Sequence, residues 1–365
     1  MNMNVFEITG KRVGAFRAAM EEKKVDAAVV CSGPGVRYLS GFAGTPGDAS
    51  LLITQNDAYI FTDSRYTIQA AEQCPYFTLK SHPASDFHAM KEFLPAPGAS
   101  VGFENLSISY AGYNKLKAGL GTDSPVGLDH AIDDLRNIKD DEEAACIRKA
   151  CDIACDALAE TVPYIKDGVT ELEVANELEY RMKKNGASST SFDTIVASGV
   201  RGALPHGLAS EKIIRGGEFV TIDFGCVYNG YCSDMTRTFS LGDADPELVK
   251  IYYTVLEAQL TAIDAYVPGM TGVALDKIAR DIIAEAGYGQ YFGHGLGHGV
   301  GLEIHEGVSV SSRSTSVLPE RSVFSIEPGI YIEGLGGVRI EDLIMCRGGE
   351  KTVLTAKSPK AFTVL

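Results

Sequence analysis

The sequence of 365 residues lacks long apolar runs and an excess of basic side chains. No stretch approaches the roughly 18 uninterrupted apolar residues of a membrane-spanning helix, and the start, MNMNVFEITGKR, lacks the apolar core of a signal peptide. Acidic residues outnumber basic ones by 48 to 33, which gives a formal net charge of −15. Because nucleic acids and anionic membranes are bound through clustered Lys and Arg, we expect neither as a partner, and we expect a cytoplasmic protein.

The eight cysteines include no CxxC pair. Cys151 and Cys155 lie four residues apart in a helical pattern, but no histidine or second cysteine pair completes a zinc site. We therefore expect reduced, buried thiols, which agrees with a cytoplasmic location.

The length of the chain favours two domains, because one compact core rarely spans so many residues. Residues 1–135 alternate helical and strand patterns, which is typical of a small α/β domain. The polar segment 137–143 opens a long helical pattern, so we place the boundary there and predict a second domain over residues 136–365.

The second domain shows helical patterns separated by short strand-like runs. Thr170 and Glu173 form a capping-box pattern at the start of one helix. Further helices are predicted at 246–266 and 273–286, and strands at 219–224, 233–240, 323–326, 330–332 and 338–344. This order predicts an α+β fold with helices packed on a largely antiparallel sheet.

Two aspartates fall on a predicted hairpin. A two-residue turn at Asn229–Gly230 is a strong hairpin signal. It pairs Asp223 with Thr236, so Asp234 lies diagonal to Asp223 on the same face of the sheet. Carboxylates this close repel each other unless a cation lies between them. The alternative is two surface aspartates on an exposed hairpin.

A glycine-rich segment, GHGLGHGVGLEIHE at residues 293–306, carries His294, His298 and His305. Glycine at every second position excludes a helix, and the segment matches neither GxGxxG nor HExxH. We expect the glycines to let backbone approach a packed site into which the histidines project. The alternative is three incidental histidines.

Two further acidic residues lie in strand patterns near the end of the chain. Glu327 follows a strand and precedes Pro-Gly, while Arg339 and Glu341 share one face of the strand predicted at 338–344. Arg339 would orient a neighbouring metal-bound carboxylate. The complete set of four carboxylates and one imidazole suits two ions of Mn²⁺, Co²⁺, Zn²⁺ or Fe²⁺; its members are Asp223, Asp234, His298, Glu327 and Glu341.

The segments VTIDFG, SDMTRT, HGLGHGVGLEIHE, SIEPGIYI and GGVRIED, in this order, resemble the pita-bread metallopeptidases. That family includes methionine aminopeptidase, aminopeptidase P, prolidase and the metal-free creatinase. The segments YLSGF and FTDSRY make residues 1–135 similar to the creatinase-like N-terminal α/β domain of the proline-directed members. The resemblance covers essentially the whole chain and implies a pita-bread catalytic domain.

The resemblance also implies a role for each candidate residue. Two divalent ions, with Mn²⁺ expected first, would be held by the five ligands. Asp223 would chelate one ion, His298 and Glu327 the other, and Asp234 and Glu341 would bridge them. A hydroxide between the ions would be the nucleophile.

The remaining roles fall on residues around the ions. Glu327 would also pass a proton to the leaving amine, and His206 and His305 would stabilise the tetrahedral oxyanion. His294 would line the substrate pocket, and Arg339 would support the ligands from behind.

The resemblance implies hydrolysis of the bond before proline at the N-terminus of short peptides, by a homodimer. Many prolidases, which cleave dipeptides, have an arginine four residues after the position of His305; here Ser309 stands there, and Arg313 is the nearest arginine. We therefore expect an Xaa-Pro aminopeptidase, with an Xaa-Pro dipeptidase as the alternative and a non-catalytic peptide-binding protein as a third interpretation.

Overall fold

The computed structural model describes residues 5–365, and its contacts divide the chain into two compact units, Met1–Arg136 and Asn137–Leu365. Residues 1–4, where the segment examined for a signal peptide begins, lie outside the described residues. Over residues 5–365, no helix is both long and apolar enough to span a bilayer.

The amino-terminal unit is an α/β domain built on a mixed sheet in the order β4-β3-β2-β1-β5-β6. Its first helix, α1 (Val5–Glu22), buries Val13, Phe16 and Met20. The strands are β1 (Ala27–Val30), β2 (Ala49–Thr54), β3 (Ala58–Thr62), β4 (Thr78–Ser81), β5 (Val101–Phe103) and β6 (Val126–Gly127). The helices are α1 (Val5–Glu22), α2 (Gly33–Ser40), α3 (Thr67–Gln73), α4 (Phe87–Lys91), α5 (Tyr110–Leu120) and α6 (Ala131–Asn137), which reaches the boundary.

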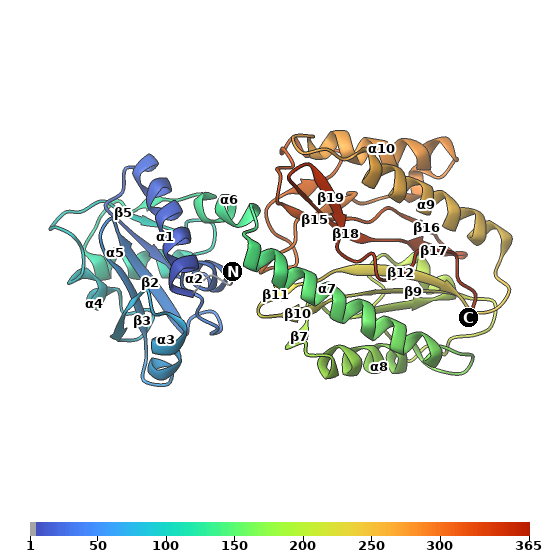
Figure 1. Cartoon of the computed structure of the whole chain (residues 1–365), viewed down its shortest axis with the longest axis horizontal. Coiled ribbons are helices and arrows are strands. Elements are labelled where there is room, and N and C mark those ends of the chain that lie inside the picture. Colours follow the sequence, from blue (N-terminus) through green and yellow to red (C-terminus); the bar gives the residue numbers. More distant parts are fainter. Residues whose placement is uncertain (1–4) are drawn as a thin grey trace. The chain divides into compact units, whose positions relative to one another are not determined.

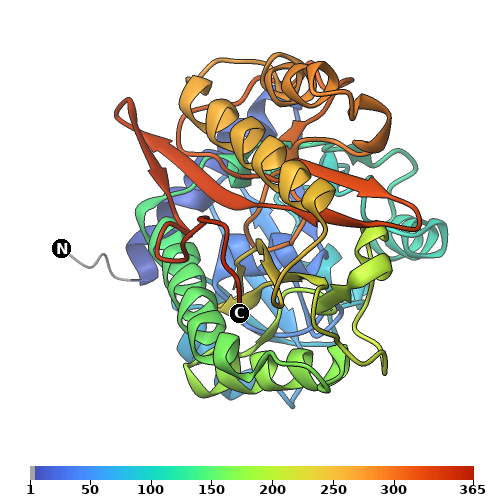
Figure 2. The same cartoon turned by 90° about the vertical axis from the view of Figure 1, so that its right-hand side faces the viewer.

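The carboxy-terminal unit has two pairs of helices, α7–α8 and α9–α10, on opposite sides of its strands (Figures 1 and 2). The helices are α7 (Asp141–Thr161), α8 (Glu171–Lys184), α9 (Pro246–Ala265) and α10 (Gly272–Glu285), with short 3-10 helices η1 (Val162–Tyr164), η2 (Gly199–Ala203) and η3 (Gly289–Tyr291). The strands are β7 (Ser189–Thr190), β8 (Ile195–Ser198), β9 (Phe219–Phe224), β10 (Cys226–Tyr228), β11 (Tyr231–Cys232), β12 (Met235–Ser240), β13 (Gly297–His298), β14 (Ser309–Val310), β15 (Val323–Ile326), β16 (Gly329–Ile332), β17 (Gly336–Arg339), β18 (Asp342–Arg347) and β19 (Glu350–Val353).

Helices α7 and α8 both begin with capping boxes. The Thr170 and Glu173 side chains each bond to the other residue's backbone N–H at the start of α8, as the sequence predicts. Asp140 and Glu143 do the same for α7. These caps satisfy backbone N–H groups that a helix start otherwise leaves unpaired.

The predicted hairpin and its register are confirmed. Tyr228 pairs with Tyr231 across the turn, and Asp223 pairs with Thr236. Asn229 and Gly230 have φ angles of 47° and 83°, the left-handed conformation that a tight two-residue turn requires at both positions. The named strands of this unit pair antiparallel throughout, which agrees with the predicted largely antiparallel sheet.

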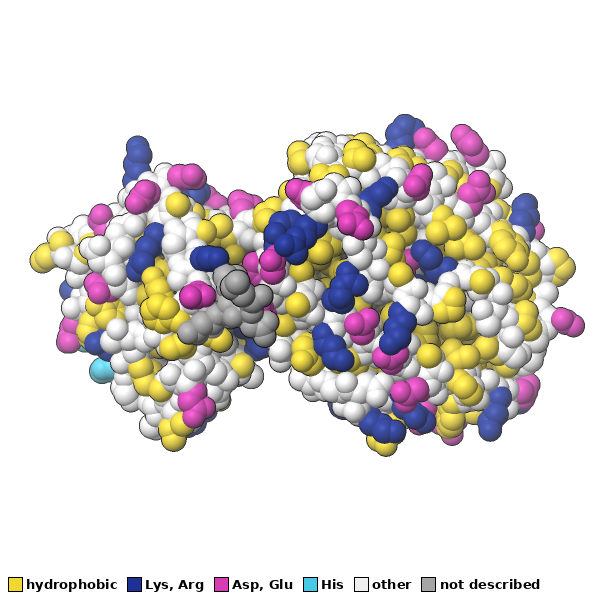
Figure 3. All heavy atoms as spheres, viewed as in Figure 1, with side chains coloured by type: hydrophobic (Ala, Val, Ile, Leu, Met, Phe, Trp, Pro, Cys, Tyr) yellow, Lys and Arg dark blue, Asp and Glu magenta, His cyan; other side chains and the backbone are white. Residues whose placement is uncertain are grey.

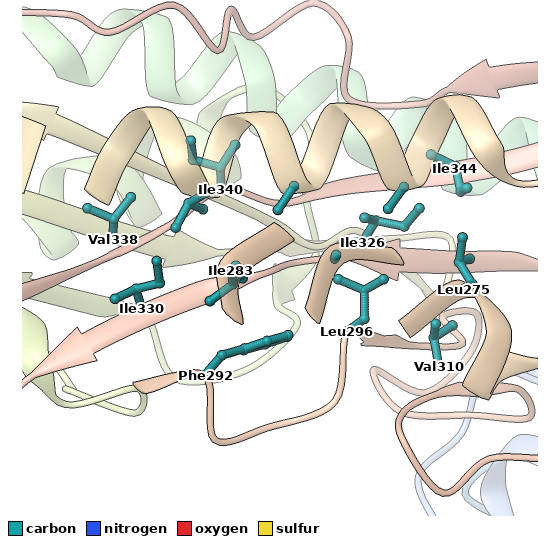
Figure 4. Close-up of a cluster of buried hydrophobic side chains, with 14 of the residues drawn as sticks. Leu275, Ile283, Phe292, Leu296, Val310, Ile326, Ile330, Val338, Ile340 and Ile344 are labelled. Atoms are coloured by element: carbon teal, nitrogen blue, oxygen red, sulfur yellow. The ribbon is translucent and has the colours of Figure 1, made fainter. Parts of the chain in front are cut away.

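A buried apolar cluster lies between α9, α10 and the strands from β13 to β18 (Figure 4). Ile326 and Ile340 belong to this cluster and are completely buried. Each directly precedes an acidic candidate, Glu327 or Glu341, so packing of the isoleucine fixes the backbone from which the carboxylate projects.

The single strand predicted at 338–344 is wrong. The chain forms β17, which pairs with β16, and then β18, which pairs with β15. The change of partner occurs at Ile340–Glu341, where the Glu341 backbone N–H donates to Thr236 O at 3.2 Å. Glu341 therefore lies in a break between two strands and not in one strand with Arg339, although both side chains bond to the Thr236 hydroxyl.

Basic, acidic and apolar side chains are interspersed on the face of the molecule seen in Figure 3. All eight cysteines fall within the described residues, and none of them forms a disulfide. Six of them are buried, and Cys31 and Cys146 are half-buried.

Candidate active site

One cavity of about 630 Å³ in the carboxy-terminal unit collects every candidate residue named from the sequence. The nine that line it are His206, Asp223, Asp234, His294, His298, His305, Glu327, Arg339 and Glu341. They come from segments spread over more than a hundred residues, so the fold brings them together.

The cavity contains a compact group of candidate metal ligands. One ligand atom from each of Asp234, His298 and Glu341 lies within 4.8 Å of the others. His298 Nε2 is 3.5 Å from Asp234 Oδ2 and 3.4 Å from Glu327 Oε1. A single ion could contact several of these atoms at ordinary ligand distances.

The imidazole of His298 has the form that a metal ligand needs. Burial, assisted by the neighbouring His305, lowers its pKa to about 4, so the ring is neutral near pH 7. Its Nδ1 is 3.2 Å from the Gly299 carbonyl oxygen, an acceptor that requires the proton on Nδ1. Nε2 therefore carries the free lone pair and points at the carboxylates.

The carboxylates are crowded and incompletely satisfied. Within residues 5–365, Asp223 Oδ1 and Glu341 Oε1 are buried polar atoms without a hydrogen-bond partner. Burial, together with the neighbouring carboxylates, raises the pKa values of Asp234 and Glu341 well above their usual range. Burial raises the pKa of Glu327 to about 8. Such a cluster is stable only with protons or cations, and divalent ions fit both its charge and its oxygen-rich donors.

Arg339 supports the ligands differently from the sequence-based expectation. Its Nη2 donates to Asp223 Oδ2 at 2.6 Å, and its Nε donates to Thr236 Oγ1 at 3.1 Å. The Thr236 hydroxyl in turn donates to Glu341 Oε2 at 2.7 Å. Arg339 therefore contacts Asp223 directly and reaches Glu341 through the Thr236 hydroxyl, to which both side chains bond.

A chain of hydrogen bonds connects Arg339 to His294. Arg339 Nη1 donates to the Tyr331 hydroxyl at 2.8 Å, and that hydroxyl is 2.9 Å from His294 Nε2. His294 Nδ1 lies 2.7 Å from the carbonyl oxygen of Gly295, which places the proton on Nδ1, and burial lowers the His294 pKa to about 4. Burial also raises the Tyr331 pKa to about 12, so its hydroxyl keeps the proton that it donates to His294.

The other two histidines approach the cavity from separate loops. The His305 ring lies 4.0 Å from the His298 ring, centroid to centroid, at 77°. His206 follows η2 in an exposed loop at the rim. Both line the cavity that holds the carboxylate cluster.

Some residues of the site were not among the candidates predicted from the sequence. Tyr331 and Thr236 lie inside the motifs quoted above, but nothing in their spacing marked them. Ser325 was also missed: its hydroxyl donates to Glu327 Oε1 at 3.1 Å and accepts from the His298 backbone N–H at 3.0 Å. The apolar wall was not foreseen either; it consists of Phe192, Ile195, Pro205, Leu208 and Ile304.

Clustered carboxylates, a neutral imidazole and further histidines around one cavity define a metal-dependent hydrolase site. Comparison with known proteins identifies the family: residues 145–347 match metallopeptidase family M24, and residues 12–138 match the creatinase/prolidase N-terminal domain. The chain belongs to this metallopeptidase family and has its pita-bread fold. It is a metallo-exopeptidase whose family uses divalent metal ions.

The similarity extends over nearly the whole chain. An Xaa-Pro dipeptidase from Pyrococcus horikoshii is 42% identical over 341 residues, covering 93% of this chain and 95% of that protein. The structure of an Xaa-Pro dipeptidase from Bacillus anthracis matches with a TM-score of 0.93 and 41% identity, covering 98% of this chain and 100% of the other. An X-Pro aminopeptidase from Thermotoga maritima matches with a TM-score of 0.88 and 38% identity, covering 95% and 100%.

Proposed function

We propose that this protein is an Xaa-Pro dipeptidase, which hydrolyses the bond between the first residue and proline in dipeptides. The carrying observation is the convergence of four carboxylates and His298 on one cavity, in a chain 42% identical to a dipeptidase across 93% of its length. This reverses the order of the two activities expected from the sequence. A non-catalytic peptide-binding role is disfavoured, since the cavity retains the complete ligand set.

The proposed metal ligands are Asp223, Asp234, His298, Glu327 and Glu341, and they would hold two divalent ions per chain, Mn²⁺ before Co²⁺, Zn²⁺ or Fe²⁺. When bound, such ions polarise a carbonyl oxygen and lower the pKa of water to about 7. The unpartnered Asp223 Oδ1 and Glu341 Oε1 support this assignment, because a buried carboxylate oxygen without a donor is costly. Arg339 would keep Asp223 in its ligand orientation through the bond at 2.6 Å.

The remaining groups would act on the peptide. His206 and His305 would donate hydrogen bonds to the oxyanion that forms at the scissile carbonyl. Glu327 would transfer a proton to the proline nitrogen as it leaves. His294, held by Tyr331, would line the wall against which the substrate packs. The substrates would be short proline-containing peptides, and we expect the enzyme to be a homodimer.

An Xaa-Pro aminopeptidase is the second candidate, and one observation favours it. A dipeptidase must accommodate the carboxylate next to its proline. Among the described residues lining the cavity, Arg339 is the one Lys or Arg, and it is already bonded to Asp223, Thr236 and Tyr331. Ser309, which pairs with His298 between β14 and β13, provides a neutral hydroxyl at the position where the resemblance to prolidases would place an arginine.

The deciding experiment compares Ala-Pro with Ala-Pro-Ala and a longer Ala-Pro peptide, using protein loaded in turn with Mn²⁺, Co²⁺, Zn²⁺ and Fe²⁺. We expect kcat/KM to be highest for Ala-Pro. A higher value for Ala-Pro-Ala would establish the aminopeptidase instead. Asp234→Asn is the control and should lose both activity and bound metal; absence of alanine release from every peptide with every metal would refute the peptidase proposal.

A further inference from the structure

The loop that carries His206 is attached to a buried carboxylate at the start of α8. Glu171 is fully buried, and its side chain accepts hydrogen bonds from the Ser198 backbone N–H at 2.8 Å and hydroxyl at 2.9 Å. It also accepts from the Ser210 hydroxyl at 2.6 Å and from Arg201 Nε at 3.0 Å. Ser198 and Ser210 lie on either side of the loop, so one carboxylate fixes both of its ends.

Arg201 extends this attachment into the loop itself. While its Nε bonds to Glu171, its Nη2 donates to the carbonyl oxygen of Leu208 at 2.6 Å. The Leu208 N–H donates to His206 O at 2.9 Å, and the Leu204 N–H donates to Arg201 O at 2.9 Å. The backbone before and after His206 is therefore tied to one arginine.

Backbone contacts also hold the far end of the loop: Leu208 pairs with Ile195 in an isolated bridge, and the Leu172 N–H donates to Ser210 O at 2.9 Å. Leu204 and Leu208 are 51% and 50% exposed, so the loop gains little from apolar packing. Over residues 5–365, no hydrogen bond or ion pair of the His206 ring is found. The position of the ring is consequently set by the backbone of the loop, to which the Arg201 side chain contributes its bond to Leu208 O.

We propose that Arg201, anchored by the buried carboxylate of Glu171, is a positioning residue that keeps His206 at the rim of the cavity in its working position. The inference rests on the proposed function, in which His206 stabilises the oxyanion. It deepens that proposal by naming the groups that place a catalytic histidine without touching the substrate. A displacement of about 1 Å of such a group can lower the rate about a hundredfold.

The first test replaces Arg201 with methionine and with lysine in the full-length, Mn²⁺-loaded protein. We expect Arg201→Met to lower kcat on Ala-Pro about 10- to 100-fold, with bound metal close to wild type. Tm should fall, because the buried Glu171 carboxylate loses its charged partner. Arg201→Lys should recover part of the loss, because one ammonium cannot bond to both Glu171 and Leu208 in the geometry of the guanidinium. Unchanged kcat in Arg201→Met would overturn the proposal.

Arg215→Met is the matched control. Arg215 also pairs with a carboxylate, that of Asp167 at 3.3 Å, but this pair is exposed and does not involve the His206 loop. Its loss should leave kcat unchanged. Hydrogen–deuterium exchange of residues 199–210, measured in metal-free protein, should accelerate in Arg201→Met and not in Arg215→Met. This readout holds even if no substrate has been found.

A double-mutant cycle separates positioning from a general structural effect. In a His206→Ala background, Arg201→Met should cause no further loss of kcat, because the group that it positions is already absent. An equal loss in both backgrounds would refute the inference. Full activity of His206→Ala would also refute it, although hydrolysis of Ala-Pro by the same protein would leave the proposed peptidase function intact.

Discussion

Gly297, the residue before His298, allows a sharp test of why the site is rich in glycine. A Cβ added to Gly297 would lie 1.9 Å from the carbonyl oxygen of Ser325, whereas real Cβ contacts stay above 3.0 Å. Strands β13, which carries Gly297, and β15, which carries Ser325, would have to separate by about 1.1 Å. Ser325 also bonds to the His298 N–H and to Glu327, so the displacement passes directly to two proposed ligands.

We therefore expect Gly297→Ala to lower kcat on Ala-Pro about a hundredfold, the effect of a misplacement of about 1 Å. Overpacking should also destabilise the protein by about 1–3 kcal/mol. Steady-state kinetics, bound metal by mass spectrometry and Tm by calorimetry measure these effects.

Gly293→Ala is the control in the same loop. Gly293 precedes His294, its φ is not in the left-handed range, and an added Cβ would meet nothing within 4 Å. This variant should retain wild-type kcat and metal. If Gly297→Ala retained full metal and kcat within about twofold of wild type, the argument that close backbone approach positions His298 would be refuted.

Three further predictions concern stability, pH and thiols. Lys139 forms a buried ion pair at 2.6 Å with Glu306. Lys139→Met should destabilise the protein by about 3–5 kcal/mol, and adding Glu306→Gln should reduce this loss of stability. Equal denaturation curves for wild type and Lys139→Met would contradict the prediction. The Glu327 pKa is raised from 4.5 to about 8, so the fold favours the protonated carboxyl. The Tm of metal-free protein should therefore fall as the pH rises from about 5 to about 8, and Mn²⁺ should reduce this dependence of Tm on pH. A Tm that does not change with pH in metal-free protein would contradict the prediction. Burial raises the Cys31 pKa to about 12, so little of this thiol is ionised at pH 8. In native protein at pH 8, iodoacetamide should therefore label Cys146 before Cys31. Labelling of Cys31 first would contradict this prediction.

Local patterns predicted much of the catalytic unit. The turn at Asn229–Gly230 determines the register of its hairpin through φ angles that few residues adopt, so the pairing of Asp223 with Thr236 followed from counting residues. The capping pattern of Thr170 and Glu173 predicted the start of α8 for a similarly local reason. The prediction that the candidate residues converge on one site rested on the order of the motifs and on the family resemblance. The distances between these residues along the chain do not by themselves indicate a metal site.

Other features depend on contacts between distant segments. The break at Ile340–Glu341 arises because β17 and β18 have different partners. The alternation of apolar and polar residues that runs from Val338 to Glu341 stops at Asp342, but it does not say which strands the two parts pair with. Tyr331 acquires its importance only from the positions of Arg339 and His294. The link from Glu171 to the His206 loop likewise joins residues whose types are ordinary for a helix start and a turn.

The change of partner at Glu341 has a consequence for the assembly of the catalytic unit. Asp223 and Asp234 lie in or next to strands packed against α7 and α8, whereas His298 and Glu327 lie in or next to those packed against α9 and α10. Glu341 lies at the junction, with its backbone bonded to β12 and its chain continuing into β18. Ions bound by all five would join the two halves of the fold by coordination bonds. Metal occupancy would then contribute to the cohesion of the unit as well as to its chemistry.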